Sequence, residues 1–148
     1  KTNIESFDII HFAAHSFPFV SEVNEAGILL VSSSEDDGIL SASEIASLTL
    51  ENKLVFLSSC ETNVGDFIPG EGINSIASSL LFAGADGVVA SLWPVNDKTA
   101  VSITDQFYSI YLKTNDPAIA IYKAQELVFT NNPHYSPSQS FPFIYISK

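Results

Sequence analysis

The chain has 148 residues, of which 46% are hydrophobic, and this suffices for one domain with a substantial core. Its 17 acidic residues outnumber 6 lysines, and the formal net charge of −11 argues against direct partners that are nucleic acids or anionic membrane surfaces. The only cysteine cannot form an internal disulfide, and no apolar run reaches the roughly 18 residues of a membrane span, so we expect a cytoplasmic protein.

A short apolar run at 7–16 gives the first predicted element. It is rich in Ile and Phe, which is typical of a buried strand, and we place the end of this strand at His15. The stretch 26–45 predicts a β-hairpin, because the Asp-Gly pair at 37–38 is a strong turn signal. We place the first arm of this hairpin at 28–31.

A short helical turn and two longer elements come next. Ser43 with Glu44 is expected to open the turn, one residue short of the ideal capping-box spacing. The run 53–59 is continuously apolar rather than alternating, which is the pattern of a strand covered on both faces. The stretch 70–85 predicts an amphipathic helix, in which Gly84 fits the C′ position. Its apolar stripe consists of Ile73, Ile76, Ala77, Leu80 and Leu81.

The last third of the chain continues the alternation of strands and helices. A third buried strand is predicted at 86–93, and the helix after it can be capped by Asn96 or Asp97. A second helix, over 115–129, starts with a proline, and 141–147 predicts a final strand. This order indicates a layered α/β fold. Parallel strands joined by helices end along one edge of the sheet, where ligands and catalytic groups gather.

Three notable side chains follow the predicted parallel strands. His15 ends the first strand, Cys60 follows the second and Trp93 ends the third, so all three should face the same crevice. A thiol becomes a good nucleophile when an imidazole takes its proton, and Cys60 with His15 therefore permits a Cys/His dyad. A lone cysteine after an apolar strand can equally be a small buried core residue.

The remaining candidate residues give weaker signals. We interpret His11 as a satisfied histidine of the sheet, and His134, in a loop rich in Pro and Ser, as solvated. No second Cys or His pair has the spacing of metal ligands, so we expect no metal site. The sequence also lacks a glycine-rich phosphate loop and a G-x-S-x-G elbow, and we expect no cofactor.

Four sequence blocks follow one another in a fixed order along the chain. They read HFAAHS, DGILSASEIASLTLENKLVFLSSCETNVG, GEGINSIASSLLFAGADGVVASLWPVND and FYSIYLKTNDPAIAIYKAQ, and a closing segment reads PHYSPSQSFPFIYIS. Together they resemble the CHAT domains, which are caspase-like peptidase modules often fused to tetratricopeptide repeats. The resemblance runs from about residue 7 to the end of the chain.

This resemblance implies a caspase-like three-layer α/β/α sandwich with a mostly parallel central sheet. The domain would comprise residues 1–148, with its core at 7–147. It implies that His15 is the general base and Cys60 the nucleophile of peptide-bond hydrolysis through a thioester. Backbone N–H groups near Ser16 and Cys60 would form the oxyanion hole. Full caspase-like domains have earlier strands and helices, so we expect this chain, which begins with Lys and contains no Met, to be the C-terminal catalytic part of a domain.

The resemblance also suggests where a substrate would bind. The end of the predicted strand 86–93 neighbours the cysteine strand, so it should line the pocket for the residue before the cut. Trp93 is either a wall of this pocket or a lid on the core. Asp97 can attract Lys or Arg there, or it can cap the following helix. Glu61 would orient the loop after the nucleophile.

The expected partners are a protein substrate and either a regulatory partner or a fused repeat domain. Two alternatives belong to other functional classes: a catalytically silent CHAT scaffold that acts as a protein-interaction module, and a structural α/β domain in which Cys60 is buried. The peptidase interpretation predicts a thiol whose reactivity depends on His15. A buried cysteine would be protonated and inert.

Overall fold

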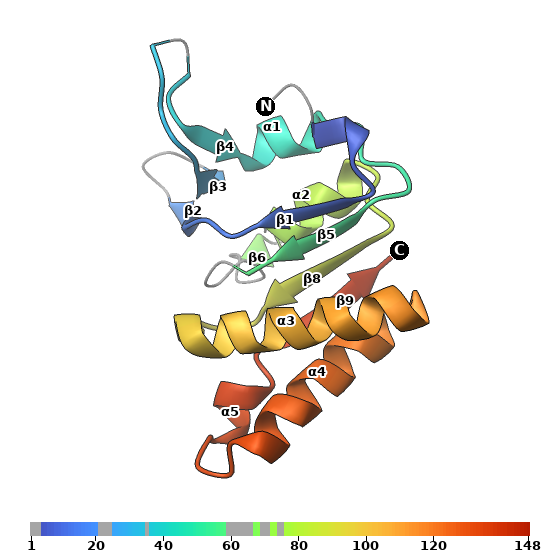
Figure 1. Ribbon diagram of the computed structural model, residues 1–148. Coiled ribbons are helices and arrows are strands. Elements are labelled where there is room, and N and C mark those ends of the chain that lie inside the picture. The colour runs from blue at the N-terminus through green and yellow to red at the C-terminus, as the bar shows by residue number, and fades with distance from the viewer. Residues whose placement is uncertain (1–3, 21–24, 35, 59–66, 69–71, 74–75) are drawn as a thin grey trace.

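The computed structural model shows a mixed α/β fold (Figure 1). It describes residues 4–20, 25–34, 36–58, 67–68, 72–73 and 76–148. None of the helices in these ranges is long and apolar enough to cross a membrane.

A four-stranded sheet forms the centre of the fold, in the order β1-β5-β8-β9. The first three strands run parallel to one another, and the fourth is antiparallel to its neighbour. The expectation of a mostly parallel central sheet is therefore confirmed. The strands are β1 (Ile9–Phe12), β5 (Leu54–Leu57), β8 (Gly87–Ser91) and β9 (Phe143–Ser147).

Helices cover both faces of this sheet, which gives three layers (Figure 1). Every residue of β5 is buried, as its continuous apolar sequence predicts. Val55 and Leu57 pack in a core cluster with α1 (Ala42–Ala46) and α2 (Ile76–Phe82). The alternate residues, Leu54 and Phe56, pack on the opposite face against the two long helices. These helices are α3 (Asp97–Thr114) and α4 (Pro117–Asn131). The arrangement is compatible with the expected caspase-like α/β/α fold.

A second sheet follows β1 directly and consists of β2, β3 and β4, which pair antiparallel. The predicted hairpin is confirmed as β3 and β4, but its first arm lies at Glu25–Leu29 rather than 28–31. Gly38 has a φ of +79°, a backbone conformation that glycine adopts without strain. The strands are β2 (Ser16–Val20), β3 (Glu25–Leu29) and β4 (Ile39–Ser41).

The end of the first strand was placed wrongly by the sequence prediction. Its pairing with β5 ends at Phe12, three residues before His15. The chain then starts β2 at Ser16 and pairs with β3 instead. One continuous apolar run thus serves two different sheets, so its composition does not reveal the break.

The short helix α1 is capped by Ser41, not by Ser43. The Glu44 N–H donates to Ser41 Oγ at 3.3 Å, and the Ser41 N–H donates to Glu44 Oε2 at 2.9 Å. This is a capping box with its full three-residue spacing. The expected helical turn is confirmed, and its cap lies two residues earlier than predicted.

Helix α2 is shorter than the predicted 70–85 helix. It begins at Ile76, because Gly72–Ile73 forms a strand, β7, that pairs with β6 (Phe67–Ile68). The predicted end is confirmed: Gly84 has a φ of +110°, and its N–H donates to the carbonyl of Leu81.

The C-terminal elements agree closely with the sequence prediction. Asn96 caps α3, and Asp116 caps α4 with Pro117 at its first position. The last strand, β9, begins two residues later than predicted, after a short helix, α5 (Pro137–Ser140). A single 3-10 turn in the described residues, Ile4–Ser6, precedes β1.

Candidate active site

The parallel pairing of β1 and β5 determines the geometry of the candidate site. Each β1 residue pairs with the β5 residue 45 positions later, and the last pair is Phe12 with Leu57. The Ser58 N–H continues this ladder by donating to the Phe12 carbonyl at 3.1 Å. The two strands are therefore neighbours in a parallel sheet, and their C-terminal ends lie at the same edge.

His15 lies just beyond that edge, in the connection between β1 and β2. Its carbonyl accepts a 2.8 Å hydrogen bond from the Leu29 N–H, and its side chain is exposed to solvent. Ser16 is half-buried and pairs with Ile28 at the start of β2. The backbone around His15 is thus fixed by β3, while its imidazole is accessible.

Cys60 and Glu61 lie outside the described residues, and the preceding described residue is Ser58. The proposed dyad with His15 therefore stays a prediction. Two facts bear on this prediction, one from the sequence and one from the strand register. Cys60 follows Ser58 by only two residues, and its separation from His15 equals the 45-residue offset of the β1–β5 register.

His11 has well-defined partners within the sheet. Its ring lies 4.9 Å from that of Phe56 and 5.8 Å from that of Tyr108, measured between centroids. His11 Nε2 lies 2.9 Å from Ser58 Oγ. Burial against these neighbours lowers the pKa of the His11 imidazole. The interpretation of His11 as a satisfied sheet histidine is confirmed.

Sequence reasoning did not single out Ser58. The register supplies the missing signal, because His11 pairs with Phe56, and Ser58 lies two residues further on. Alternate residues of a strand share a face, so Phe56 and Ser58 point to the same side as His11.

Trp93 lies two residues after β8 and lines a small pocket of about 120 Å³. Its indole N–H donates to the Ser138 carbonyl at 2.7 Å, which holds the ring against the segment before β9. Whether this pocket is the one that receives the substrate residue before the cut stays a prediction. The other lining residues are Pro94, Val95, Asn96, Thr99, Ser138 and Gln139.

Asp97 lies at the first position of α3, is exposed, and does not line this pocket. Asn96 fulfils the capping role instead, since its Oδ1 accepts the Lys98 N–H at 3.0 Å. The Asp97 carboxylate is therefore not needed for the cap. His134 is exposed, as predicted.

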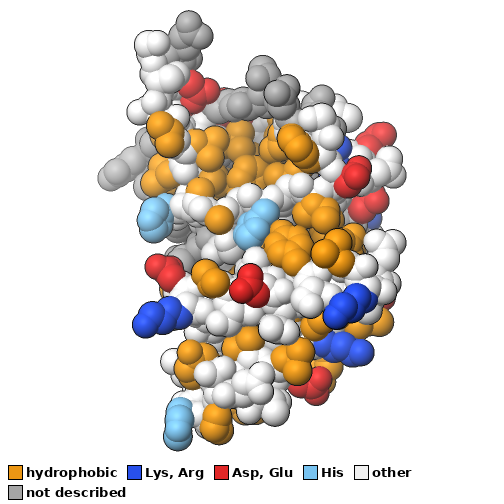
Figure 2. Space-filling view, viewed as in Figure 1, with side chains coloured by type: hydrophobic (Ala, Val, Ile, Leu, Met, Phe, Trp, Pro, Cys, Tyr) orange, Lys and Arg blue, Asp and Glu red, His pale blue; other side chains and the backbone are white. Residues whose placement is uncertain are grey.

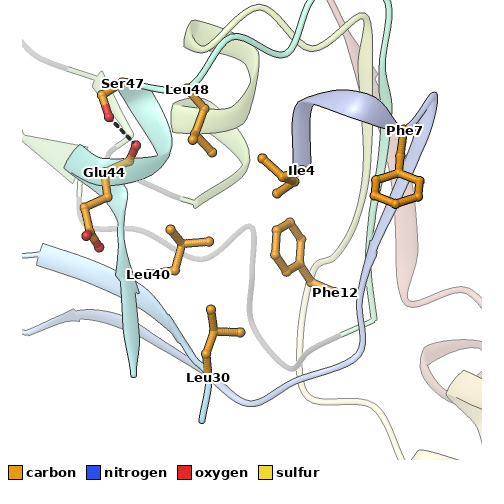
Figure 3. A pocket seen from close by; sticks show the side chains of 8 residues that line it. All are labelled: Ile4, Phe7, Phe12, Leu30, Leu40, Glu44, Ser47 and Leu48. Atoms are coloured by element: carbon orange, nitrogen blue, oxygen red, sulfur yellow. Dashed lines mark hydrogen bonds between the residues drawn. The ribbon is translucent and has the colours of Figure 1, made fainter. Parts of the chain in front are cut away.

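A second, apolar pocket of about 460 Å³ lies away from these residues, between β1, the β3–β4 hairpin and α1 (Figure 3). On the face shown in Figure 2, hydrophobic side chains gather over this region. Its two polar lining residues, Glu44 and Ser47, hydrogen-bond within α1. No predicted site residue lines it. The remaining lining residues are Ile4, Phe7, Phe12, Leu30, Leu40 and Leu48.

Comparisons with known proteins agree with the resemblance seen in the sequence. A family model described as "CHAT domain" matches residues 1–142. Tetratricopeptide repeat protein 28 of Homo sapiens is 29% identical over 108 residues, which are 73% of this chain and 4% of that protein. The protein of the same name from Mus musculus is 29% identical over 100 residues, 68% of this chain and 4% of its own length. The chain thus spans only a small part of these relatives.

Proposed function

This chain belongs to the CHAT-domain family, a caspase-like, peptidase-related module, and from that premise we propose that it is a cysteine endopeptidase. Cys60 is the nucleophile and His15 the general base. The observation that carries the proposal is the β1–β5 register, whose offset of 45 residues also separates His15 from Cys60. Both residues follow the C-terminal ends of adjacent parallel strands, where catalytic groups gather in α/β sheets.

The reaction follows from the chemistry of the two side chains. The His15 imidazole takes the thiol proton of Cys60, and the thiolate attacks the carbonyl carbon of the scissile peptide bond. Backbone N–H groups near Ser16 and Cys60 stabilise the oxyanion of the tetrahedral intermediate. When the C–N bond breaks, His15 returns its proton to the leaving amine, and a thioester remains on Cys60. A water molecule deprotonated by His15 then hydrolyses this thioester and regenerates the free enzyme.

The substrate is a protein, and its side chain before the cut binds beside the end of β8. Trp93 supports this part of the proposal, because its ring lines a pocket held in place by the hydrogen bond to Ser138. Asp97 contributes an exposed carboxylate near the same segment, which would favour Lys or Arg. Glu61 would orient the loop that follows the nucleophile.

Activity is controlled by a partner or an attached repeat domain in this proposal. It is supported by the relatives, which are named as tetratricopeptide repeat proteins and are far longer than this chain. A reducing compartment such as the cytoplasm would keep the only cysteine in its reactive thiol form.

The proposal is tested by the rate of Cys60 alkylation with iodoacetamide as a function of pH. Cys60 is the only cysteine, so the signal has one source. We expect the alkylation midpoint of the native chain well below the value of about 8.5 for a free thiol. The midpoint of His15→Ala should lie close to that free-thiol value. His134→Ala, which removes another exposed histidine, is the matched control and should keep the native profile.

A thiol with the same midpoint in native and His15→Ala protein would contradict the proposal. The silent scaffold would then be the better interpretation, because binding a partner requires neither side chain. If the dyad is present, cleavage of a peptide library would identify the residue before the cut.

A further inference from the structure

We propose that His11 is a positioning residue that, through Ser58, holds the C-terminal end of β5 and thereby the chain that leads to Cys60. This inference rests on the proposed function, since it assigns a role in aligning the Cys60 thiol with His15. It concerns two residues that neither the family match nor the resemblance assigns to the site.

Ser58 makes three hydrogen bonds to residues of β1, and these fix the end of β5. Ser58 Oγ lies 2.9 Å from His11 Nε2 and donates to the Phe12 carbonyl at 3.3 Å. A hydroxyl has one proton, so with that proton on the Phe12 carbonyl the oxygen accepts from the His11 Nε2–H. The Ser58 N–H donates to the same carbonyl at 3.1 Å. Both the backbone and the side chain of Ser58 are thus tied to β1.

The His11 ring is itself held by packing. It lies against Phe56, a fully buried residue whose ring also contacts Phe107 and Phe143. Tyr108 of α3 contacts both His11 and Phe56. The His11 side chain is exposed, but these ring contacts restrict its orientation and place Nε2 beside Ser58 Oγ.

This attachment is close enough to the nucleophile to matter. Cys60 follows Ser58 by two residues, and two residues of extended chain span at most about 7 Å. A displacement of about 1 Å in a catalytic group can lower a rate by roughly a hundredfold. In this proposal His15 is the base, and His11, whose Nε2 lies within hydrogen-bond distance of Ser58 Oγ, is a positioning residue. It acts on the thiol only by fixing the strand end.

The test uses variants that remove one member of the hydrogen bond at a time. His11→Phe keeps an aromatic ring but has no donor, and Ser58→Ala removes the hydroxyl. Ser58→Thr keeps the hydroxyl and is the conservative control. Cys60 alkylation against pH and the free energy of unfolding are measured for each variant, for the double variant and for His15→Ala.

We expect His11→Phe and Ser58→Ala each to move the alkylation midpoint by about one pH unit toward that of a free thiol. Below both midpoints this lowers the rate about tenfold. The double variant should move it no further, and Ser58→Thr should keep the native midpoint. If His11→Phe does not fold, Ser58→Ala and Ser58→Thr still decide the question.

The outcomes separate this inference from the proposed function. Native midpoints in folded His11→Phe and Ser58→Ala, together with a shifted midpoint in His15→Ala, would overturn the positioning role alone. A loss of unfolding free energy without a midpoint shift would show a merely structural role and would also overturn it. An unshifted midpoint in His15→Ala would overturn the proposed function and the inference with it.

Discussion

Replacement of Gln125 by Leu should destabilise the fold by about 2–4 kcal/mol, because this side chain completes the outer edge of the sheet. Gln125 lies on α4 and is 4% exposed. Its Nε2 donates to the Phe143 carbonyl at 3.1 Å, and its Oε1 accepts the Phe143 N–H at 2.8 Å. Strand β9 is the last strand of the described sheet, so the amide of Gln125 occupies the place of a further strand.

The magnitude follows from the two backbone groups that lose their partner. A buried donor or acceptor left without a hydrogen bond costs about 1–3 kcal/mol. Leu has nearly the volume of Gln, so it creates little cavity, and its apolar atoms offset part of the loss. The net cost of about 2–4 kcal/mol would lower the Tm by roughly 5–15 °C for a domain of this size.

Urea denaturation of the native and Gln125→Leu chains measures this difference directly. The midpoint should fall while the slope with denaturant stays constant, which indicates a change in stability rather than in compactness. Gln106→Leu is the matched control, because Gln106 is exposed on α3 and should change stability by no more than about 0.5 kcal/mol. A Gln125→Leu effect as small as that of the control would refute the reasoning.

Two further predictions concern α3. Asn96→Ala should lower the free energy of unfolding by about 1 kcal/mol, because it removes the cap on the Lys98 N–H. Asp97→Ala should lower it by about 0.5 kcal/mol or less. Equal losses in urea denaturation would contradict the assignment of the cap to Asn96. Burial raises the pKa of Tyr108 to about 12, so unfolded chains lose this proton near pH 10 while folded chains retain it. The free energy of unfolding in urea should therefore fall as the pH rises from about 10 to about 12, and Tyr108→Phe should weaken this fall. The same pH dependence in both chains would contradict the prediction.

The central layer of the fold could be predicted because burial on both faces leaves a strong mark in the sequence. All four residues of β5 and all five of β8 are buried, and both strands read as continuous apolar runs. The starts of α3 and α4 could also be predicted from the sequence, since Asn, Asp and Pro favour helix starts through local chemistry. These features depend on neighbours in sequence or on full burial.

Errors occurred where partners distant in sequence or a short pairing decided the structure. The run that contains β1 stays apolar past Phe12, but the strand leaves β5 there and joins β3 through β2. The predicted helical start near residue 70 gave way to the pairing of β7 with β6. Both segments have residues compatible with either structure, so local propensity could not decide between them.

The positions of His11 and His15 relative to β5 depend on the register of β1, which the core fixes. A shift of the β1–β5 register by one residue would turn every side chain of β1 to the opposite face. Ile10 and Val55, which pair across the two strands, are both buried in the cluster with α1 and α2, and this burial fixes the register. His11 then faces the aromatic cluster and Ser58, while His15 lies beyond the paired strands. Two histidines four residues apart therefore have different surroundings: His11 Nε2 lies beside Ser58 Oγ, whereas His15 lies in the connection to β2, where we propose that it acts as the base.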